Sequence, residues 1–250
     1  MSETRVALVT GASQGIGYAT AEQLSRAGFS VLLVADCAES ELEAAMSRCA
    51  GDDGRCAALR LDLGEPEAPA AMIEAALNTF GRLDVLVNNA AIRIRHPFGE
   101  YEAAEFDRLM AVNVRAAFMA SQAAVPIMKG QQGGRIIHVA SQIGLVAFDQ
   151  SALYGLSKAS LIYLARAMAF ELAPFGIRVN AVSPGPVATE YNFARFERDP
   201  GLQARRSAEV PAGRYGRPEE VAQLICFLAY EAPDYLLGEN IVIDGGYVSH

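Results

Sequence analysis

Short apolar runs alternate with longer amphipathic stretches along the whole chain. Four runs rich in Val, Ile and Leu each follow a glycine that would end a preceding helix: GFSVLLV from Gly28, GRLDVLV from Gly81, GRIIHVA from Gly134 and GIRVNAV from Gly176. With RVALVT, AALRLDL and ENIVID, they predict about seven strands. The apolar spacing between the strands predicts helices near residues 16–27, 40–50, 66–80, 103–129, 152–174 and 218–230.

This βαβα pattern predicts an α/β fold. Near-continuous apolar strands are typical of a parallel sheet covered by helices on both faces, because each crossover lays a helix across the sheet. The sequence has no linker-like or low-complexity segment, so we expect one doubly wound domain over residues 1–250. In such a sheet, ligands lie beyond the carboxyl ends of the strands.

Two helix starts have specific signals. Ser40 and Glu43 form an S-x-x-E pattern, which predicts a capping box at the start of the second helix. Pro218, followed by Glu219 and Glu220, predicts the start of the last one.

Composition narrows the classes of function. Hydrophobic residues make up 52% of the chain and charged residues 20%, which supports a well-buried core. A net charge of -8 argues against general binding to nucleic acid or anionic membranes, since phosphates would be repelled. We find neither a signal-peptide pattern nor a run of 18 apolar residues, and we expect a cytoplasmic protein. The four cysteines and three histidines have neither zinc-site nor disulfide-framework spacing.

The stretch TGASQGIG follows the first apolar run and places Gly11, Gly15 and Gly17 at a strand-to-helix turn. Free N–H groups at the start of the following helix suit a phosphate there. A P-loop would need a lysine that the stretch lacks, and the spacing also departs from the usual G-x-G-x-x-G. The alternative is a plain tight turn.

Polar residues end the next three strands. Asp36 comes 19 residues after Gly17, near the ~20-residue offset at which a carboxylate meets the adenosine ribose of NAD. A helix N-cap is the alternative for Asp36. Asp62 suits either the adenine edge or a cap for the helix near residue 66. The asparagines of NNAA, at residues 88–91, are turn formers or part of a surface for a flat ring.

After the fifth strand come Ser141 and then YGLSK, in which Tyr154 and Lys158 share one helix face at positions i and i+4. Proton transfer by a phenol near neutral pH needs its pKa lowered by about three units, or ~4 kcal/mol. An ammonium about 4 Å away would supply roughly that much at an effective dielectric near 20. Ser141 could donate a hydrogen bond to a substrate oxygen. An ordinary surface Tyr and Lys is the alternative.

Together these motifs resemble the short-chain dehydrogenase/reductase family. TGASQGIG is similar to its cofactor glycine motif, NNAA to its NNAG, and Ser141 with YGLSK to its active site. The likeness extends through Asn113 in MAVNV, through SPGPVATE and to ENIVIDGG, and so covers essentially the whole chain. It implies a Rossmann-like domain that binds NAD(H) or NADP(H) and moves a hydride between the nicotinamide and a secondary alcohol or ketone.

The resemblance also implies roles for residues. Tyr154 would be the acid/base, Lys158 would lower its pKa and hold the nicotinamide ribose, Ser141 would orient the substrate oxygen, and Asn113 would support a water next to Lys158. The cofactor would bind Gly11, Ser13, Gln14, Gly15, Ile16, Gly17, Asp36, Asp62, Leu63, Asn89, Ala90, Ala91, Tyr154, Lys158, Pro184, Gly185, Val187 and Thr189. A homotetramer or homodimer is expected.

Two positions depart from the family pattern. Ala91 replaces the last glycine of NNAG, and Asp36 lies one position later than the ribose-binding Asp of many NAD-preferring members, with Ala35 in the usual place. Since neither Gln14 nor Cys37 is basic, nothing obvious recognises a 2′-phosphate. NAD(H) is therefore favoured, and NADP(H) is possible.

The resemblance also implies that the segments after strands four, five and six build the substrate pocket; here these are IRIRHPF, QIGLVAFDQ and a lid near residues 187–210. Arg93, Arg95 and Arg195 could recognise a carboxylate, a phosphate or an acyl-carrier partner, with solvated surface arginines as the favoured alternative. The leading hypothesis is an oxidoreductase for a small or medium hydrophobic alcohol or ketone. The others are an NADPH-dependent 3-oxoacyl-[acyl-carrier-protein] reductase and a non-catalytic nucleotide-binding regulator.

Overall fold

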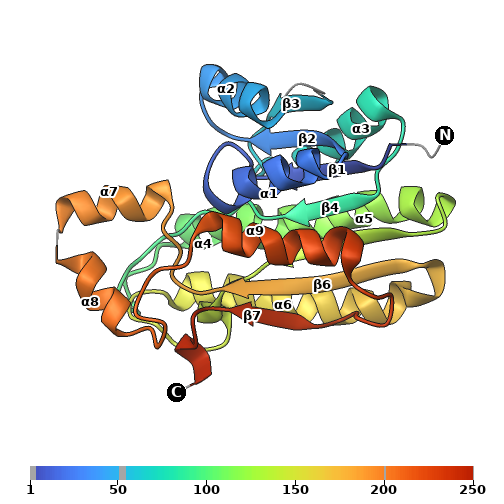
Figure 1. Ribbon diagram of the computed structural model, residues 1–250. Coiled ribbons are helices and arrows are strands. Elements are labelled where there is room, and N and C mark those ends of the chain that lie inside the picture. The colour runs from blue at the N-terminus through green and yellow to red at the C-terminus, as the bar shows by residue number, and fades with distance from the viewer. Residues whose placement is uncertain (1–3, 51–54, 200, 250) are drawn as a thin grey trace.

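Seven parallel strands form one sheet in the computed structural model, which describes residues 4–50, 55–199 and 201–249 (Figure 1). The strand order is β3-β2-β1-β4-β5-β6-β7, so the connections reverse direction between β1 and β4. The strands are β1 (Val6–Thr10), β2 (Ser30–Ala35), β3 (Cys56–Arg60), β4 (Val85–Asn88), β5 (Gly134–Val139), β6 (Ile177–Pro184) and β7 (Asn240–Ile243). The predicted parallel sheet is thereby confirmed.

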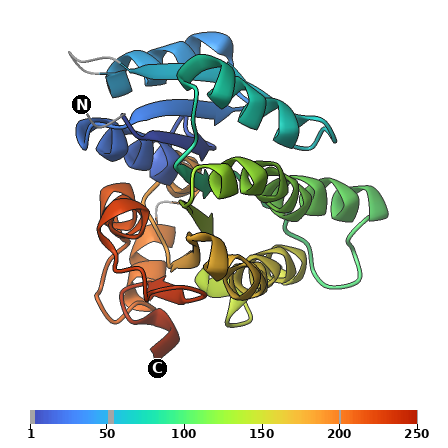
Figure 2. The same cartoon turned by 90° about the vertical axis from the view of Figure 1, so that its right-hand side faces the viewer.

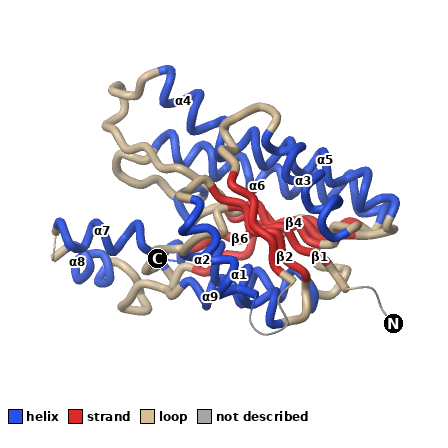
Figure 3. Tube along the Cα trace, turned by 90° about the horizontal axis from the view of Figure 1, so that it is seen from above, coloured by secondary structure: helices blue, strands red, loops and turns tan. Residues whose placement is uncertain are grey.

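Helices cover both faces of this sheet (Figures 2 and 3). One face carries α1 (Gly15–Arg26), α2 (Glu39–Ala50) and α9 (Pro218–Cys226). The other carries α3 (Ala68–Phe80), α5 (Ala116–Gly130) and α6 (Ala152–Leu172). Beyond the carboxyl ends of the strands lie α4 (Ala103–Met110), α7 (Glu190–Arg198) and α8 (Leu202–Ala208). Among the described residues, no helix is long and apolar enough to cross a bilayer.

The core divides into two layers because successive strand residues point to opposite faces. In β1, Ala7 and Val9 pack in the layer under α1, α2 and α9. Val6 and Leu8 pack in the layer under α3, α5 and α6. The all-apolar β1 run therefore feeds both layers, as expected for a strand that is covered on both faces.

Two local expectations need correction. Ser40 is not an N-cap, because α2 already begins at Glu39 and its first turn closes with the bond from Leu42 N to Ala38 O at 3.1 Å. The helix expected over 103–129 is interrupted by a π-helical turn at Ala111–Arg115, so that α4 and α5 are separate elements. The lid segment contains α7 and α8, which no sequence pattern predicted as helices.

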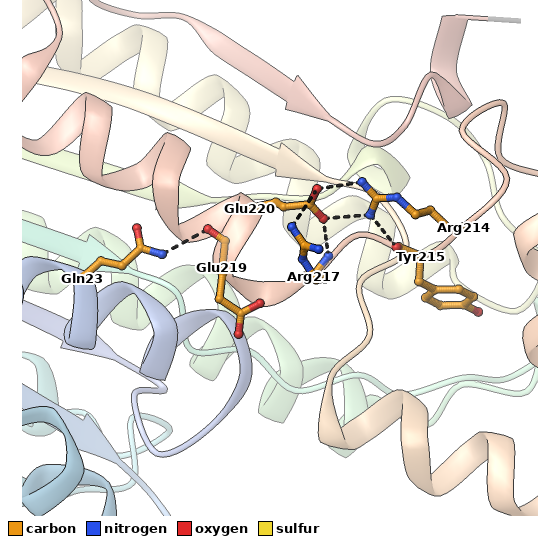
Figure 4. Close-up of polar contacts among 6 residues, drawn as sticks. All are labelled: Gln23, Arg214, Tyr215, Arg217, Glu219 and Glu220. Carbon is orange, nitrogen blue, oxygen red and sulfur yellow. Dashed lines mark hydrogen bonds and ion pairs between the residues drawn. The ribbon is translucent and has the colours of Figure 1, made fainter.

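The predicted helix start at Pro218 is confirmed, and it is reinforced by Glu220 (Figure 4). Glu220 Oε2 accepts from Arg217 N at 2.8 Å, and the carboxylate pairs with both terminal nitrogens of Arg214 at 2.8 and 2.7 Å. Arg214 also donates to Tyr215 O at 3.0 Å. The bonds from Arg214 to the carboxylate, followed by the bond from Arg217 N, lower the pKa of Glu220 to about 2. The loop that carries Tyr215 is thus fixed to the start of α9.

The same helix start is joined to α1. Gln23 Nε2 donates to Glu219 O at 3.2 Å, a contact between segments that lie far apart in sequence (Figure 4).

Candidate active site

The glycine turn between β1 and α1 has the conformation that the sequence predicted. Gly11 and Gly15 have positive φ angles of 64° and 56°, which L side chains rarely adopt. At Gly17, a Cβ atom would lie 2.0 Å from Gly11 O. Gln14 at the N-cap makes no side-chain capping bond, so the first N–H groups of α1 have no side-chain cap. The turn therefore fits the pyrophosphate of a dinucleotide.

Thr10 and Asn89 join the ends of β1 and β4 at the point where the strand order reverses. Thr10 Oγ1 accepts from Asn89 N at 2.9 Å and from Ala90 N at 3.0 Å. Asn89 Nδ2 donates to Thr10 O at 2.8 Å and to Gly11 O at 3.2 Å. The Asn89 side chain thus holds the glycine turn in place.

A cavity of about 420 Å³ extends from the glycine turn toward β2 and β3. Asp36, Asp62 and Leu63 line it, and Asp36 is exposed. Asp62 Oδ1 accepts from Gly64 N at 2.8 Å and from Arg108 Nη2 at 2.9 Å. The bond from Arg108 is the main reason why the pKa of Asp62 is lowered.

Asp62 is not the helix cap that its position also suggested, because Glu67 occupies the N-cap of α3. Sequence reasoning missed Arg108, which reaches this cavity from α4 across the strand ends. No local signal marks it, since Arg108 and Asp62 are 46 residues apart.

Ser141, Tyr154 and Lys158 come together beyond the end of β5. Ser141 Oγ accepts from Ile143 N at 3.2 Å, and its hydroxyl lies near enough to the Tyr154 phenol to lower the pKa of that phenol. Lys158 is 2% exposed, and its Nζ donates to Val139 O at 2.7 Å. The Lys158 Nζ lies 5.7 Å from the centre of the Tyr154 ring. The alternative of an ordinary surface Lys158 is therefore wrong.

Burial dominates the electrostatics of this pair. It raises the pKa of Tyr154 and lowers the pKa of Lys158 to about 7, because both charged forms lose solvation. The expectation that Lys158 brings the phenol pKa down is not met. The largest opposing influence on the Tyr154 pKa is the charge of Arg93, followed by the hydroxyl of Ser141.

Asn113 lies behind the site, in the π-helical turn, and is 1% exposed. Its side-chain amide bonds both backbone groups of Ile92, with Oδ1 accepting from N at 2.8 Å and Nδ2 donating to O at 3.0 Å. Nδ2 also donates to Ser157 Oγ at 3.1 Å. Among the predicted site residues, Asn113 is the one that lines neither cavity; it holds the loop that follows β4.

A second cavity, of about 480 Å³, continues from the first one and shares Tyr154 with it. All the predicted cofactor residues line one cavity or the other: Gly11, Ser13, Gln14, Gly15, Ile16, Gly17, Asp36, Asp62, Leu63, Asn89, Ala90, Ala91, Tyr154, Lys158, Pro184, Gly185, Val187 and Thr189. Ser141 lines the second cavity. The two cavities form one cleft along the carboxyl edge of the sheet.

Arg93 and Arg206 bring positive charge to the second cavity. The Arg93 Cζ lies 5.0 Å from the centre of the Tyr154 ring, and its Nη2 donates to Ser151 Oγ at 3.1 Å. A solvated surface arginine is therefore the wrong interpretation of Arg93. Sequence reasoning missed Arg206 of α8, and the Arg195 side chain lies outside the described residues.

Comparisons with known proteins agree with this geometry. A family model described as enoyl-(acyl carrier protein) reductase matches residues 11–248. A 3-oxoacyl-[acyl-carrier-protein] reductase from Thermotoga maritima is 36% identical, over 98% of both chains. An NAD-dependent glycerol dehydrogenase from Listeria innocua is 33% identical, over 97% of this chain and 93% of the relative.

Solved structures show the same fold. A short-chain type dehydrogenase/reductase from Mycobacterium marinum superposes with a TM-score of 0.91 at 36% identity, over 99% of this chain and 97% of the other. Sequence, fold and the arrangement of the cleft agree: the chain belongs to the short-chain dehydrogenase/reductase family, whose enzymes act on CH–OH groups with NAD or NADP.

Proposed function

We propose that the protein interconverts a secondary alcohol and a ketone of a small molecule, with Tyr154 as the acid/base. The observation that carries this proposal is the position of Tyr154. Tyr154 lines both cavities, and Ser141, whose hydroxyl lowers the pKa of the phenol, lines the second one. A group that exchanges a proton with the reacting oxygen has to stand where the two cavities meet.

The residues of the first cavity fit a nicotinamide dinucleotide. The glycine turn and the uncapped start of α1 suit the pyrophosphate, and the exposed Asp36 suits the adenosine ribose hydroxyls. When bound, the nicotinamide supplies or accepts the hydride. Asp36 favours NAD(H), because a carboxylate repels a 2′-phosphate, and Arg108 is already engaged by Asp62.

Each residue around Tyr154 has a task in this scheme. In the direction of alcohol oxidation, the Tyr154 phenolate takes the hydroxyl proton while Ser141 holds the same oxygen. The positive charge of Arg93 and the Ser141 hydroxyl favour the phenolate, because both lower the pKa of Tyr154. Lys158 is poised for proton exchange, since its pKa is about 7. Asn113 acts by holding the loop from Ile92 to Arg93.

Residues 187–210 serve as a lid over the second cavity. Tyr191 and Asn192 of α7 and Arg206 and Glu209 at α8 line that cavity. The lid packs against the opposite wall of the cavity through Phe196, whose ring meets the ring of Tyr215 edge-on, with the ring centres 5.1 Å apart.

The carrier-protein reductase stays as a second candidate, because the relative from Thermotoga maritima carries that name. It would use NADPH and a basic docking surface, against which Asp36 and the net charge of -8 argue. A non-catalytic regulator would need neither Ser141 and Tyr154 at one cavity nor a buried Lys158 beside them.

Replacing Tyr154 by Phe tests the proposal. The change removes the proton donor but little volume, so turnover should fall by about 100-fold to 10,000-fold with dinucleotide affinity nearly unchanged. Steady-state rates and titration with NADH and NADPH measure the two effects. Substantial residual turnover would refute the role of Tyr154.

The cofactor preference has a test of its own. Asp36→Ala should weaken NADH binding and improve NADPH binding relative to it. If neither affinity changes, Asp36 does not contact the ribose and the preference for NAD(H) fails.

We also infer self-association through α5 and α6. Phe118 and Met119 of α5 and Tyr163 and Phe170 of α6 are exposed, with Phe170 86% and Tyr163 71% accessible. Side chains of this size gather on surfaces that pair with another chain. Sedimentation should show a homodimer or homotetramer at micromolar concentration; a monomer would contradict this.

A further inference from the structure

Three guanidinium groups converge on the ring of Phe148, which lines the second cavity. The distances from Cζ to the ring centre are 5.8 Å for Arg93, 5.9 Å for Arg95 and 4.7 Å for Arg206. Three positive charges around one ring make the electrostatic potential at this end of the cavity more positive, and Glu209 offsets the charge of Arg206 through two hydrogen bonds. The charge that remains favours a negatively charged occupant of the cavity.

The charged side chains that line this cavity are unbalanced. Its lining residues include three basic side chains, Arg93, Lys158 and Arg206, and one carboxylate, that of Glu209. Glu209 is bound to Arg206, whose Nη1 lies 3.0 and 2.8 Å from the two carboxylate oxygens. Arg93 donates to Ser151 Oγ at 3.1 Å and lies nearer to the Tyr154 ring centre, at 5.0 Å, than Lys158 does, at 5.7 Å. Its position in the cavity makes Arg93 the cation that a carboxylate of the substrate would meet.

Arg93 is also close to the reacting atoms. Its Cζ lies 5.0 Å from the Tyr154 ring centre, so an anion on Arg93 belongs to the same molecule as the reacting carbon. The planar fork of a guanidinium matches a carboxylate and can bond both oxygens. A cavity of about 480 Å³ limits such a molecule to a small acid.

A second polar feature lies in the same cavity. Gln142 is 4% exposed, lines the cavity, and its Oε1 has no hydrogen-bond partner among the described groups. A buried amide oxygen without a hydrogen-bond partner destabilises the folded protein, and a hydroxyl group of a ligand could donate the missing hydrogen bond.

We propose that the substrate is a small hydroxycarboxylic acid, or the corresponding keto acid, whose carboxylate binds Arg93. Gln142 accepts a hydrogen bond from a further hydroxyl of the substrate. This inference rests on the proposed function. In oxidation, the alcohol carbon gives a hydride to the nicotinamide, the hydroxyl proton goes to Tyr154, a C=O bond forms, and the carboxylate is unchanged.

The test compares acids with their uncharged counterparts. The probes are 3-hydroxybutyrate, gluconate and cis-4-hydroxycyclohexanecarboxylate, each paired with its carboxamide. At least one acid should have a higher kcat/KM than its amide. Arg93→Gln should lower that acid-to-amide ratio by about 10-fold to 100-fold, the range of a charge-assisted hydrogen bond. Arg93→Lys, which keeps the charge but loses the fork, should restore part of the ratio.

Arg26→Gln is the matched control, since the Arg26 side chain is 74% accessible and belongs to α1. It should leave the ratio unchanged. Gln142→Leu should lower kcat/KM for gluconate more than for 3-hydroxybutyrate, which has no second hydroxyl.

A binding measurement keeps this inference separate from the catalytic proposal. Calorimetry with the dinucleotide-bound enzyme should show cyclohexanecarboxylate binding more tightly than cyclohexanecarboxamide, with the difference lost in Arg93→Gln. Equal binding of the two, or binding of neither, overturns the inference, as does an equal loss of activity on acid and amide in Arg93→Gln. Turnover by Tyr154→Phe would instead overturn the proposed function and leave the calorimetric result standing.

Discussion

Arg93 should control the pH at which the enzyme works, apart from any role in binding substrate. Its Cζ lies 5.0 Å from the Tyr154 ring centre, and its charge is the largest influence that lowers the pKa of this buried phenol. With this ring-centre distance as a rough measure of the separation between the guanidinium and the phenolate, two unit charges about 5 Å apart at an effective dielectric near 20 interact by roughly 3 kcal/mol, or about two pKa units. Because Arg93 is partly open to solvent, which screens its charge, we expect about one to two units.

The sign follows from the charge. A cation stabilises the phenolate, so Arg93→Gln removes that stabilisation and moves the kinetic pKa of Tyr154 upward. The assay is kcat/KM for alcohol oxidation between about pH 6 and about pH 11, read where the rising limb reports the free enzyme's base. An uncharged carboxamide should be the substrate, so that lost carboxylate binding does not enter the profile.

Two variants calibrate the result. Arg93→Lys retains a cation and should shift the profile less than Arg93→Gln, whereas Arg26→Gln should not shift it. A profile that stays in place in Arg93→Gln, or that moves to lower pH, would refute the assignment of the phenol's electrostatics to Arg93.

Three other perturbations have definite outcomes. Gly17→Ala would push a methyl group against Gly11 O, so the free energy of unfolding, measured by chemical denaturation, should fall by about 3 kcal/mol or more. Gly130→Ala is the control, because an added methyl group there would have no neighbouring atom within 4 Å and should leave the free energy of unfolding nearly unchanged. Because the folded-state pKa of Lys158 is depressed to about 7 from 10.5, the unfolded chain binds more protons between these values. Wild type should therefore gain stability relative to Lys158→Met as pH rises from about 7 to about 10.5; a constant difference would contradict the depressed pKa. The pKa of Glu220 is lowered from 4.5 to about 2, so its ionised carboxylate stabilises the folded protein fully above about pH 4.5 and less as the pH falls toward 2. The difference in melting temperature between wild type and Glu220→Gln should therefore shrink over that pH range. A difference that stays constant at low pH would count against the ion pair.

Periodicity was enough to predict the sheet, and the strand ends together with the family resemblance predicted the residues that line the cleft. An apolar run such as Val6 to Val9 cannot face water on either side, so it identifies a covered strand without further information. The end of each such strand then marks where ligands gather, which is how Asp36, Asn89 and Ser141 were found.

The failures have physical causes that no local pattern carries. Ser40 satisfied the S-x-x-E rule equally well one position inside the helix, so the pattern did not fix where α2 begins. The electrostatics of Tyr154 depend on burial, which belongs to the tertiary structure. Arg206 reaches the cavity from a helix of the lid, 52 residues beyond Tyr154 in the sequence.

α4 and the π-helical turn that follows it contact both the nucleotide cavity and the loop that leads to Arg93. Arg108 lines the nucleotide cavity, and the side chain of Asn113 is hydrogen-bonded to both backbone groups of Ile92, the residue before Arg93. Arg108 and Asn113 are five residues apart along one continuous helical stretch, which corresponds to roughly 7–8 Å at the α-helical rise. We therefore expect cofactor choice and substrate choice to be linked, so that exchanging α4 and its π-helical turn for those of a relative should alter both.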